Sequence, residues 1–136
     1  MFKMFNYLRS PIEKGAMVFV VFIIFVGVMA FAVKAVIEKV SSGDDLKEGD
    51  VYIFNDPYDG GTHLSDFRLV KPIFRDGAVF CYIASVGHWH DVGGNVPGNY
   101  NPEATESFQE GILVPPVKLF KEGTPKPMNR FPSSTK

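Results

Sequence analysis

Two strand-like segments joined by an Arg-Asp-Gly turn at 75–77 constrain the fold of this 136-residue chain more than any other feature. The segments, 67–74 and 78–86, are rich in β-branched and aromatic residues, and Asp-Gly is a strong signal for a two-residue hairpin turn. Pro72 cannot donate a hydrogen bond to a neighbouring strand, so the first segment is predicted to lie at a sheet edge at that point. The sequence therefore predicts an antiparallel hairpin.

The three histidines of the chain, His63, His88 and His90, lie in glycine-rich loops at the ends of predicted strands. Counted outward from the turn, Asp66 stands ten residues before Asp76 and the second strand has returned to the same level ten residues after it. Antiparallel pairing brings such positions within about 5 Å, so His63 and Asp66 should meet His88 at the open end of the hairpin.

Two imidazoles and a carboxylate suit a divalent metal that keeps open coordination positions. The alternative is that these loop side chains only cap turns and hydrogen-bond to the backbone. His-x-x-Asp is a weak motif by itself, and spacing alone leaves both interpretations open.

The remaining sequence predicts an α+β fold, in which an N-terminal apolar helix precedes a small mixed or antiparallel sheet with long Gly-rich loops. Helical spacing of apolar residues marks 29–40, and a short strand is predicted at 51–54. Residues 112–120 should be extended, and the proline-rich tail from 124 to 136 should be disordered. The single cysteine, Cys81, lies in an apolar segment, which predicts a buried and unreactive thiol.

An uncharged run extends over residues 15–33 and is long enough to cross a bilayer. A secretory signal is an alternative, because Ala30-Phe31-Ala32 has the small-x-small pattern of a cleavage site, and a buried core helix is a third. The charges, 14 Lys plus Arg against 15 Asp plus Glu, form no basic block. Nucleic acid is therefore not an expected partner.

Residues 49–120 read GDVYIFNDPYDGGTHLSDFRLVKPIFRDGAVFCYIASVGHWHDVGGNVPGNYNPEATESFQEGILVPPVKLF. This segment resembles the hydantoinase B/oxoprolinase family. The family is similar, without a gap, to GDVFILNDPYxGGTHLPDVTLVxPVFxDGxLVGFVASxGHHxDIGGxxPGSxxPxATExFxEGLxIPPVKL. The resemblance suggests a partial family domain at 27–123, between a non-family N-terminus with the apolar run, 1–26, and the tail, 124–136.

The resemblance implies a B-type subunit of a metal-dependent enzyme. Such subunits act with an A-type partner that binds ATP, and together they open cyclic amides such as hydantoin or 5-oxoproline, or carboxylate ketones. The metal ligands of related carboxylases fall on His63, Asp66 and His88, with Zn, Mn or Fe as the candidate metal. Asp56 and Asp91 also match family positions, where they are candidates to orient a histidine, with turn capping as the alternative.

The chain departs from the family at its N-terminus. The family has a segment there that contributes an acidic residue and histidines near the metal, whereas this chain has FVVFIIFV. We therefore expect a fragment of the larger family fold that is inactive alone. The alternative is a catalytically inactive, membrane-tethered fragment or truncated gene product, anchored by residues 15–33, although the family itself is cytoplasmic.

Overall fold

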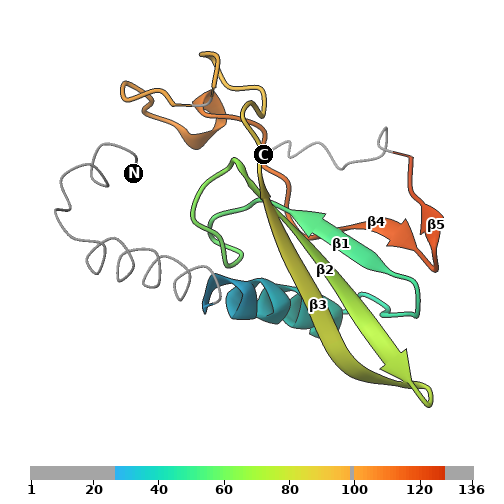
Figure 1. Cartoon of the computed structure of the whole chain (residues 1–136). Helices are drawn as coiled ribbons and strands as arrows, with labels where there is room; N and C mark the ends of the chain where they lie inside the picture. The colour runs from blue at the N-terminus through green and yellow to red at the C-terminus, as the bar shows by residue number, and fades with distance from the viewer. Residues whose placement is uncertain (1–26, 99, 128–136) are drawn as a thin grey trace, which may run out of the picture.

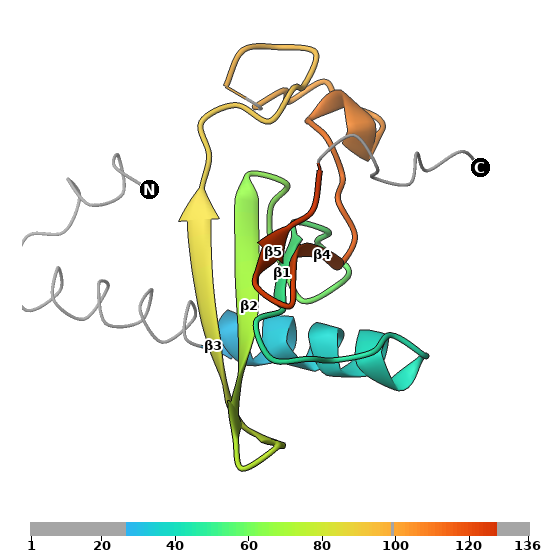
Figure 2. The same cartoon turned by 90° about the vertical axis from the view of Figure 1, so that its right-hand side faces the viewer.

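The computed structural model describes residues 27–98 and 100–127, which form a five-stranded sheet with one α-helix across it. All neighbouring strands are antiparallel, in the order β3-β2-β1-β4-β5. In Figures 1 and 2 the helix, residues 27–41, crosses the strands on one face of the sheet. The elements are β1 (Val51–Phe54), β2 (Asp66–Arg75), β3 (Ala78–His88), the 3₁₀ helix η1 (Ser107–Gln109), β4 (Val117–Lys121) and β5 (Thr124–Pro125).

This architecture shows that the predicted α+β fold with an N-terminal apolar helix was wrong, because the described chain is mostly β. The described part of its helix, residues 27–41, is amphipathic. Ala32 and Val36, four residues apart, are fully buried, while Lys34 and Glu38 form an exposed ion pair at 3.6 Å. An uncharged run records hydrophobicity but not which residues will face a sheet.

The predicted membrane span, 15–33, falls mostly outside the described residues. Within 27–98 and 100–127, no helix has the length and apolar character needed to cross a membrane. The described part of the chain therefore gives the transmembrane prediction no support.

The predicted hairpin is confirmed as β2 and β3. Its two central turn residues, Asp76 and Gly77, have φ values of 53° and 80°, as a type I′ turn requires. The register differs from the simple count, because the turn is centred between these residues and the pairing shifts between Ile73 and Phe74. Both effects move the second strand, so that Asp66 pairs directly with His88.

Pairing of β2 with β1 involves only the first half of β2. The register with β1 covers Arg68 to Val70, whereas the register with β3 continues through Pro72 and beyond. Pro72 thus lies past the end of the β1 ladder, which fits its inability to donate there. Because β3 is the outer strand of the sheet, its Cys81 is exposed, and the predicted burial of this thiol was wrong.

Successive strand residues point to opposite faces, and each face carries its own hydrophobic cluster. The cluster on the helix side buries five side chains and packs the helix against the sheet. The other cluster packs the loops against the opposite face. The first contains Ala32, Val36, Tyr52, Phe54 and Val70, and the second contains Leu64, Phe67, Val92 and Val114.

The loop after β3 extends beyond the open end of the hairpin and is closed at its base (Figure 1). Gly93 and Gly111 form an antiparallel bridge, and the amide of Ile112 donates to the carbonyl of Val92 at 2.9 Å. The two ends of this long loop therefore leave and re-enter the sheet side by side.

A second hairpin joins β4 and β5. Its turn residues, Glu122 and Gly123, have φ values of 51° and 78°, the same pattern as the first turn. Thr124 and Pro125, within the segment expected to form a tail, pair with Lys121 and Phe120. Residues 128–136, the rest of that segment, lie outside the described residues.

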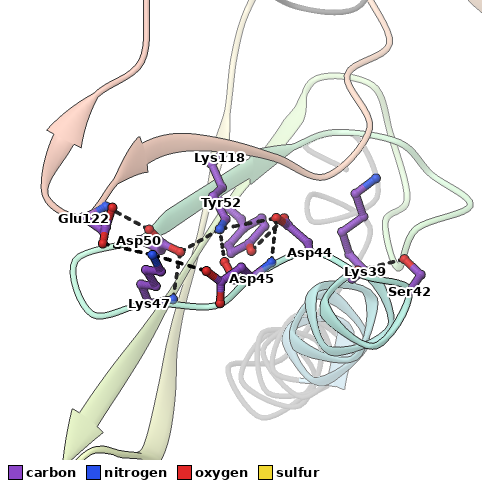
Figure 3. A network of polar contacts seen from close by, with 9 residues as sticks. All are labelled: Lys39, Ser42, Asp44, Asp45, Lys47, Asp50, Tyr52, Lys118 and Glu122. Carbon is purple, nitrogen blue, oxygen red and sulfur yellow. Dashed lines mark hydrogen bonds and ion pairs between the residues drawn. The ribbon is translucent and has the colours of Figure 1, made fainter.

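A buried lysine of β4 holds the loop between the helix and β1 (Figure 3). The Nζ atom of Lys118 lies 2.9 Å from the carboxylate of Asp50 and 3.3 Å from that of Asp44, and it also donates to the carbonyl of Asp45. The hydroxyl of Tyr52 donates to the same Asp44 carboxylate at 2.9 Å. These contacts join the loop before β1 to Lys118 of β4, which is far from that loop in the sequence.

Burial of Asp50 and Lys118 opposes their ionisation, whereas the hydrogen bonds that they make favour ionisation. For Asp50, burial raises the pKa, but hydrogen bonds from Lys118 and from the amides of Glu122 and Lys47 outweigh it and leave the pKa lowered. For Lys118, burial lowers the pKa, but the hydrogen bond to Asp50 and the charge of Asp44 leave it raised.

These directions predict a bell-shaped stability profile. A lowered Asp50 pKa stabilises the fold above its ordinary value of 3.8, and this contribution is lost as the pH falls through the folded-state pKa. A raised Lys118 pKa stabilises the fold below 10.5, and this contribution is lost as the pH rises through the folded-state pKa. Urea midpoints should therefore fall at both extremes, and Asp50→Asn should flatten the acid limb. An unchanged acid limb in that variant would contradict the prediction.

Candidate functional site

The candidate site lies at the open end of the β2–β3 hairpin, where Asp66 begins β2 and His88 ends β3. The Asp66 carboxylate is buried and accepts three hydrogen bonds. Its Oδ1 faces Nδ1 of His88 at 2.7 Å, and its Oδ2 faces Nδ1 of His63 at 3.1 Å and the hydroxyl of Thr62 at 2.8 Å. The three residues expected from the sequence to meet, His63, Asp66 and His88, are thus brought together. We call these three residues and Thr62 the Asp66 cluster.

A compact turn places His63 next to Asp66. The amide of Asp66 donates to the carbonyl of His63 at 3.1 Å, which folds the chain back so that both side chains meet. The amide of Trp89, immediately after His88, donates to the carbonyl of Ser65 at 2.9 Å. Backbone bonds therefore join the two sides of the site independently of its side chains.

The site combines a buried anion with two accessible rings. Burial raises the pKa of Asp66, but hydrogen bonds from His88, Thr62 and His63 outweigh burial, and the pKa is lowered. Asp66 is therefore ionised at neutral pH. The side chains of His63 and His88 are 73% and 65% exposed, against 6% for Asp66, so a ligand would reach the imidazoles first.

The donor chemistry suits a divalent metal, since two imidazoles and one carboxylate are common ligands of such ions. When Nδ1 of each ring donates its proton to Asp66, Nε2 is left as an acceptor. The observed arrangement is a hydrogen-bonded cluster. Within residues 27–98 and 100–127, no group of three or more His, Cys, Asp or Glu side chains is disposed to hold a metal ion.

A small cavity of about 130 Å³ adjoins the cluster, next to Val28 and Met29 of the helix. It combines apolar and polar lining. Its lining comprises Val28, Met29, Thr62, His63, Asp66, Arg68 and Val86. A larger cavity of about 670 Å³ lies elsewhere, between the end of the helix and β4.

Asp56 and Asp91 cap turns in this structure. The Oδ1 atom of Asp56 accepts from the amide of Tyr58, and that of Asp91 from the amide of Gly93, each at 2.9 Å. Each bond spans two residues, as in Asx-turns. The third histidine, His90, lies two residues beyond the end of β3 and is exposed.

Asn55 is a buried residue that no sequence pattern singled out. Its Nδ2 atom donates to the carbonyls of Leu64 and Ile112, both at 2.7 Å, and its Oδ1 atom accepts from the amide of Val114 at 2.6 Å. The amide of Asn55 also donates to the carbonyl of Val114 at 3.0 Å. Asn55 therefore joins the loop before β2 to the segment that leads into β4.

Arg68 was also missed. It is fully buried on β2, and its guanidinium donates only to backbone carbonyls among the described hydrogen bonds. These carbonyls belong to Asp66 (from Nε, 3.2 Å), Asp56 and Asp59 (from Nη1, 3.3 and 3.5 Å) and Asn55 (from Nη2, 3.1 Å). The available sequence signal was the spacing of a charged residue: Arg68 stands two residues before Val70, so both side chains point to the same face of β2.

Comparison with known proteins identifies the class to which this chain belongs. The model of the hydantoinase B/oxoprolinase family matches residues 13–130. The chain is a member of the hydantoinase B/oxoprolinase family, as its motifs suggested.

Two relatives show what the chain is similar to. The caprolactamase subunit beta of Pseudomonas jessenii is 44% identical over 81 residues, covering 60% of this chain and 14% of that protein. The crystal structure of the ATP-dependent caprolactamase from Pseudomonas jessenii matches with a TM-score of 0.67 and 40% identity, covering 74% of this chain and 17% of that one.

The second relative is an acetone carboxylase. Its nucleotide-free structure, described as part of ATP-dependent acetone carboxylation, matches with a TM-score of 0.69 and 28% identity. The match covers 76% of this chain and 14% of that chain. The present chain thus spans less than a fifth of the length of these relatives.

Proposed function

We propose that this chain contributes a metal-binding hairpin to a B-type subunit of an ATP-coupled amidohydrolase or ketone carboxylase. The observation that carries the proposal is the convergence of two imidazole Nδ1 atoms on the buried carboxylate of Asp66, at 2.7 and 3.1 Å. It occurs in a chain whose relatives include an ATP-dependent caprolactamase and an acetone carboxylase. The proposed ligands are His63, Asp66 and His88.

Each residue of the trio has a distinct task. Asp66, held in place by the backbone of β2 and by Thr62, supplies the charge that attracts a cation. His63 and His88 supply exposed imidazole nitrogens that can bind the cation. A bound Zn, Mn or Fe ion would polarise a substrate carbonyl or activate a water or carboxyl phosphate.

The substrate and the nucleotide belong to a larger assembly. A small cyclic amide or a ketone is the proposed substrate class, by analogy with the named relatives. We assign ATP to an A-type partner subunit, because Gly60-Gly61 and Gly93-Gly94 are not followed by the Lys-Ser/Thr of a phosphate-binding loop. For the same reason, this chain alone should not couple ATP to turnover.

A metal-retention experiment tests the proposal. The purified chain should bind about one equivalent of Zn²⁺ or Mn²⁺, and His63→Ala should weaken binding at least about tenfold, because a ligand is lost. His90→Ala is the matched control, since it removes a neighbouring exposed histidine outside the Asp66 cluster. Calorimetric titration and elemental analysis after dialysis would measure both. Equal losses in the two variants would mean nonspecific histidine binding and would reject the assignment.

A further inference from the structure

We infer that Arg68 is the positioning residue of the Asp66 cluster, acting through the backbone of the 55–66 loop. The inference rests on the proposed function, because the cluster it positions is the proposed metal site. Arg68 itself touches none of the three proposed ligands through their side chains in any described hydrogen bond. It holds the loop that carries two of them.

The guanidinium lies at the centre of the loop. Four of its hydrogen bonds reach carbonyls at residues 55, 56, 59 and 66, which span the whole loop from β1 to β2. Only a planar group with five N–H donors can serve so many acceptors in different directions. The loop is therefore wrapped around one side chain, and its shape depends on that side chain.

Glycines allow the loop to close on this centre. A Cβ atom at Gly61 would overlap the Arg68 guanidinium, so this position can be filled only if the arginine moves. A Cβ at Gly60, where φ is 83°, would lie 2.7 Å from the backbone of Phe31 in the helix. The loop is thus held between the helix and Arg68, immediately before Thr62 and His63.

Burying a cation with carbonyl partners alone is costly, and this cost indicates what Arg68 is for. Burial lowers the pKa of Arg68 despite the opposing charges of Asp66, Asp56 and Asp59, yet a guanidinium stays charged at neutral pH. The cation also lies 5.2 Å from the centre of the Phe54 ring. An apolar residue would fill this space more cheaply, but it could not hold four carbonyls.

The cavity beside the cluster links Arg68 to the proposed ligands. Arg68 lies two residues after Asp66 on the same strand face, and both line the cavity with Thr62 and His63. If the loop relaxes, His63 should leave its place beside Asp66, whereas His88, on β3, should stay.

A four-variant comparison in the full chain tests the inference: Arg68→Met, Arg68→Lys, Gly61→Ala, and Gly61→Ala combined with Arg68→Met. Arg68→Met should weaken Mn²⁺ binding about tenfold and speed hydrogen exchange of the loop amides of Asp59 and Gly61 to a similar degree. Amides of the β2–β3 ladder should keep their protection. Arg68→Lys should not rescue either property, because charge without the planar fork cannot serve the carbonyls.

Gly61→Ala separates positioning from general stability. It should reproduce the effects of Arg68→Met when Arg68 is present and add nothing in the double variant, because the clash then has no partner. Unchanged loop exchange and Mn²⁺ affinity within twofold of the parent in Arg68→Met would overturn the inference. If Arg68→Met does not fold, Gly61→Ala decides, and normal loop exchange there overturns it. A parent that binds no Mn²⁺ rejects the metal proposal, while loop exchange still decides the role of Arg68.

Discussion

Replacing Lys118 with methionine is expected to lower the free energy of unfolding by about 3 to 5 kcal/mol, the usual cost of breaking a buried ion pair from one side. The side chain of Lys118 is 6% exposed, and that of its partner Asp50 is fully buried. Methionine preserves most of the volume, so the loss comes from the charge left unpaired. Asp50 would keep its two backbone amide donors but would face no cation.

Urea unfolding followed by circular dichroism would measure this loss. Lys47→Met is the matched control, because Lys47 pairs with Asp45 and Glu122 in the same network but its side chain is 44% exposed. Exposed pairs contribute little, so this variant should unfold close to the parent. Similar urea midpoints for both lysine variants would show that Lys118 is not the centre of the network.

Changing Asn55 to aspartate should be comparably damaging, about 3 kcal/mol or more, although only an amide nitrogen becomes an oxygen. The Nδ2 atom of Asn55 donates to two buried carbonyls, and a carboxylate oxygen there would face both with no proton to offer. Burial beside these carbonyls would therefore raise the folded-state pKa of the introduced carboxyl and keep it protonated. Its stability relative to the parent should fall as the pH rises above about 3.9, the ordinary aspartate value.

Thermal unfolding of this variant near pH 4 and pH 7 would check both the size and the pH dependence of the loss. Asn95→Asp is the control, because Asn95 is exposed and its side-chain oxygen accepts a hydrogen bond from Asn101 that a carboxylate can also accept. A loss at position 55 that does not change with pH would mean that no ionisable group had been buried.

The hairpin and the site at its end were predictable because their signals are local. The Asp76-Gly77 pair predicts a two-residue turn, in which both residues have positive φ. This turn and the strand-like segments on either side of it predict the register of the hairpin to within a residue or two. The remaining error arose from the shift at Ile73 and Phe74, which no pattern in the sequence announces. The meeting of His63, Asp66 and His88 survived this error because it depends on an approximate register only.

Other features depend on contacts between residues far apart in sequence, and these could not be predicted. Lys118 meets Asp50 only because β4 pairs with β1, and nothing in β4 identifies that partner. Asn55 looked like an ordinary loop residue in the sequence. Its buried role was hidden because its hydrogen-bond partners are Leu64, Ile112 and Val114. Arg68 looked like an ordinary polar strand residue until the loop was seen to fold over it.

The closed base of the loop after β3 separates the tip of that loop from the site. Because Gly93 and Gly111 are bridged and Ile112 bonds back to Val92, the two ends of the loop form a fixed frame at its base. Insertions or deletions in the tip need not move His88, which precedes the frame. Substitutions in the tip can therefore change what surrounds the site while the donors of the Asp66 cluster stay in place.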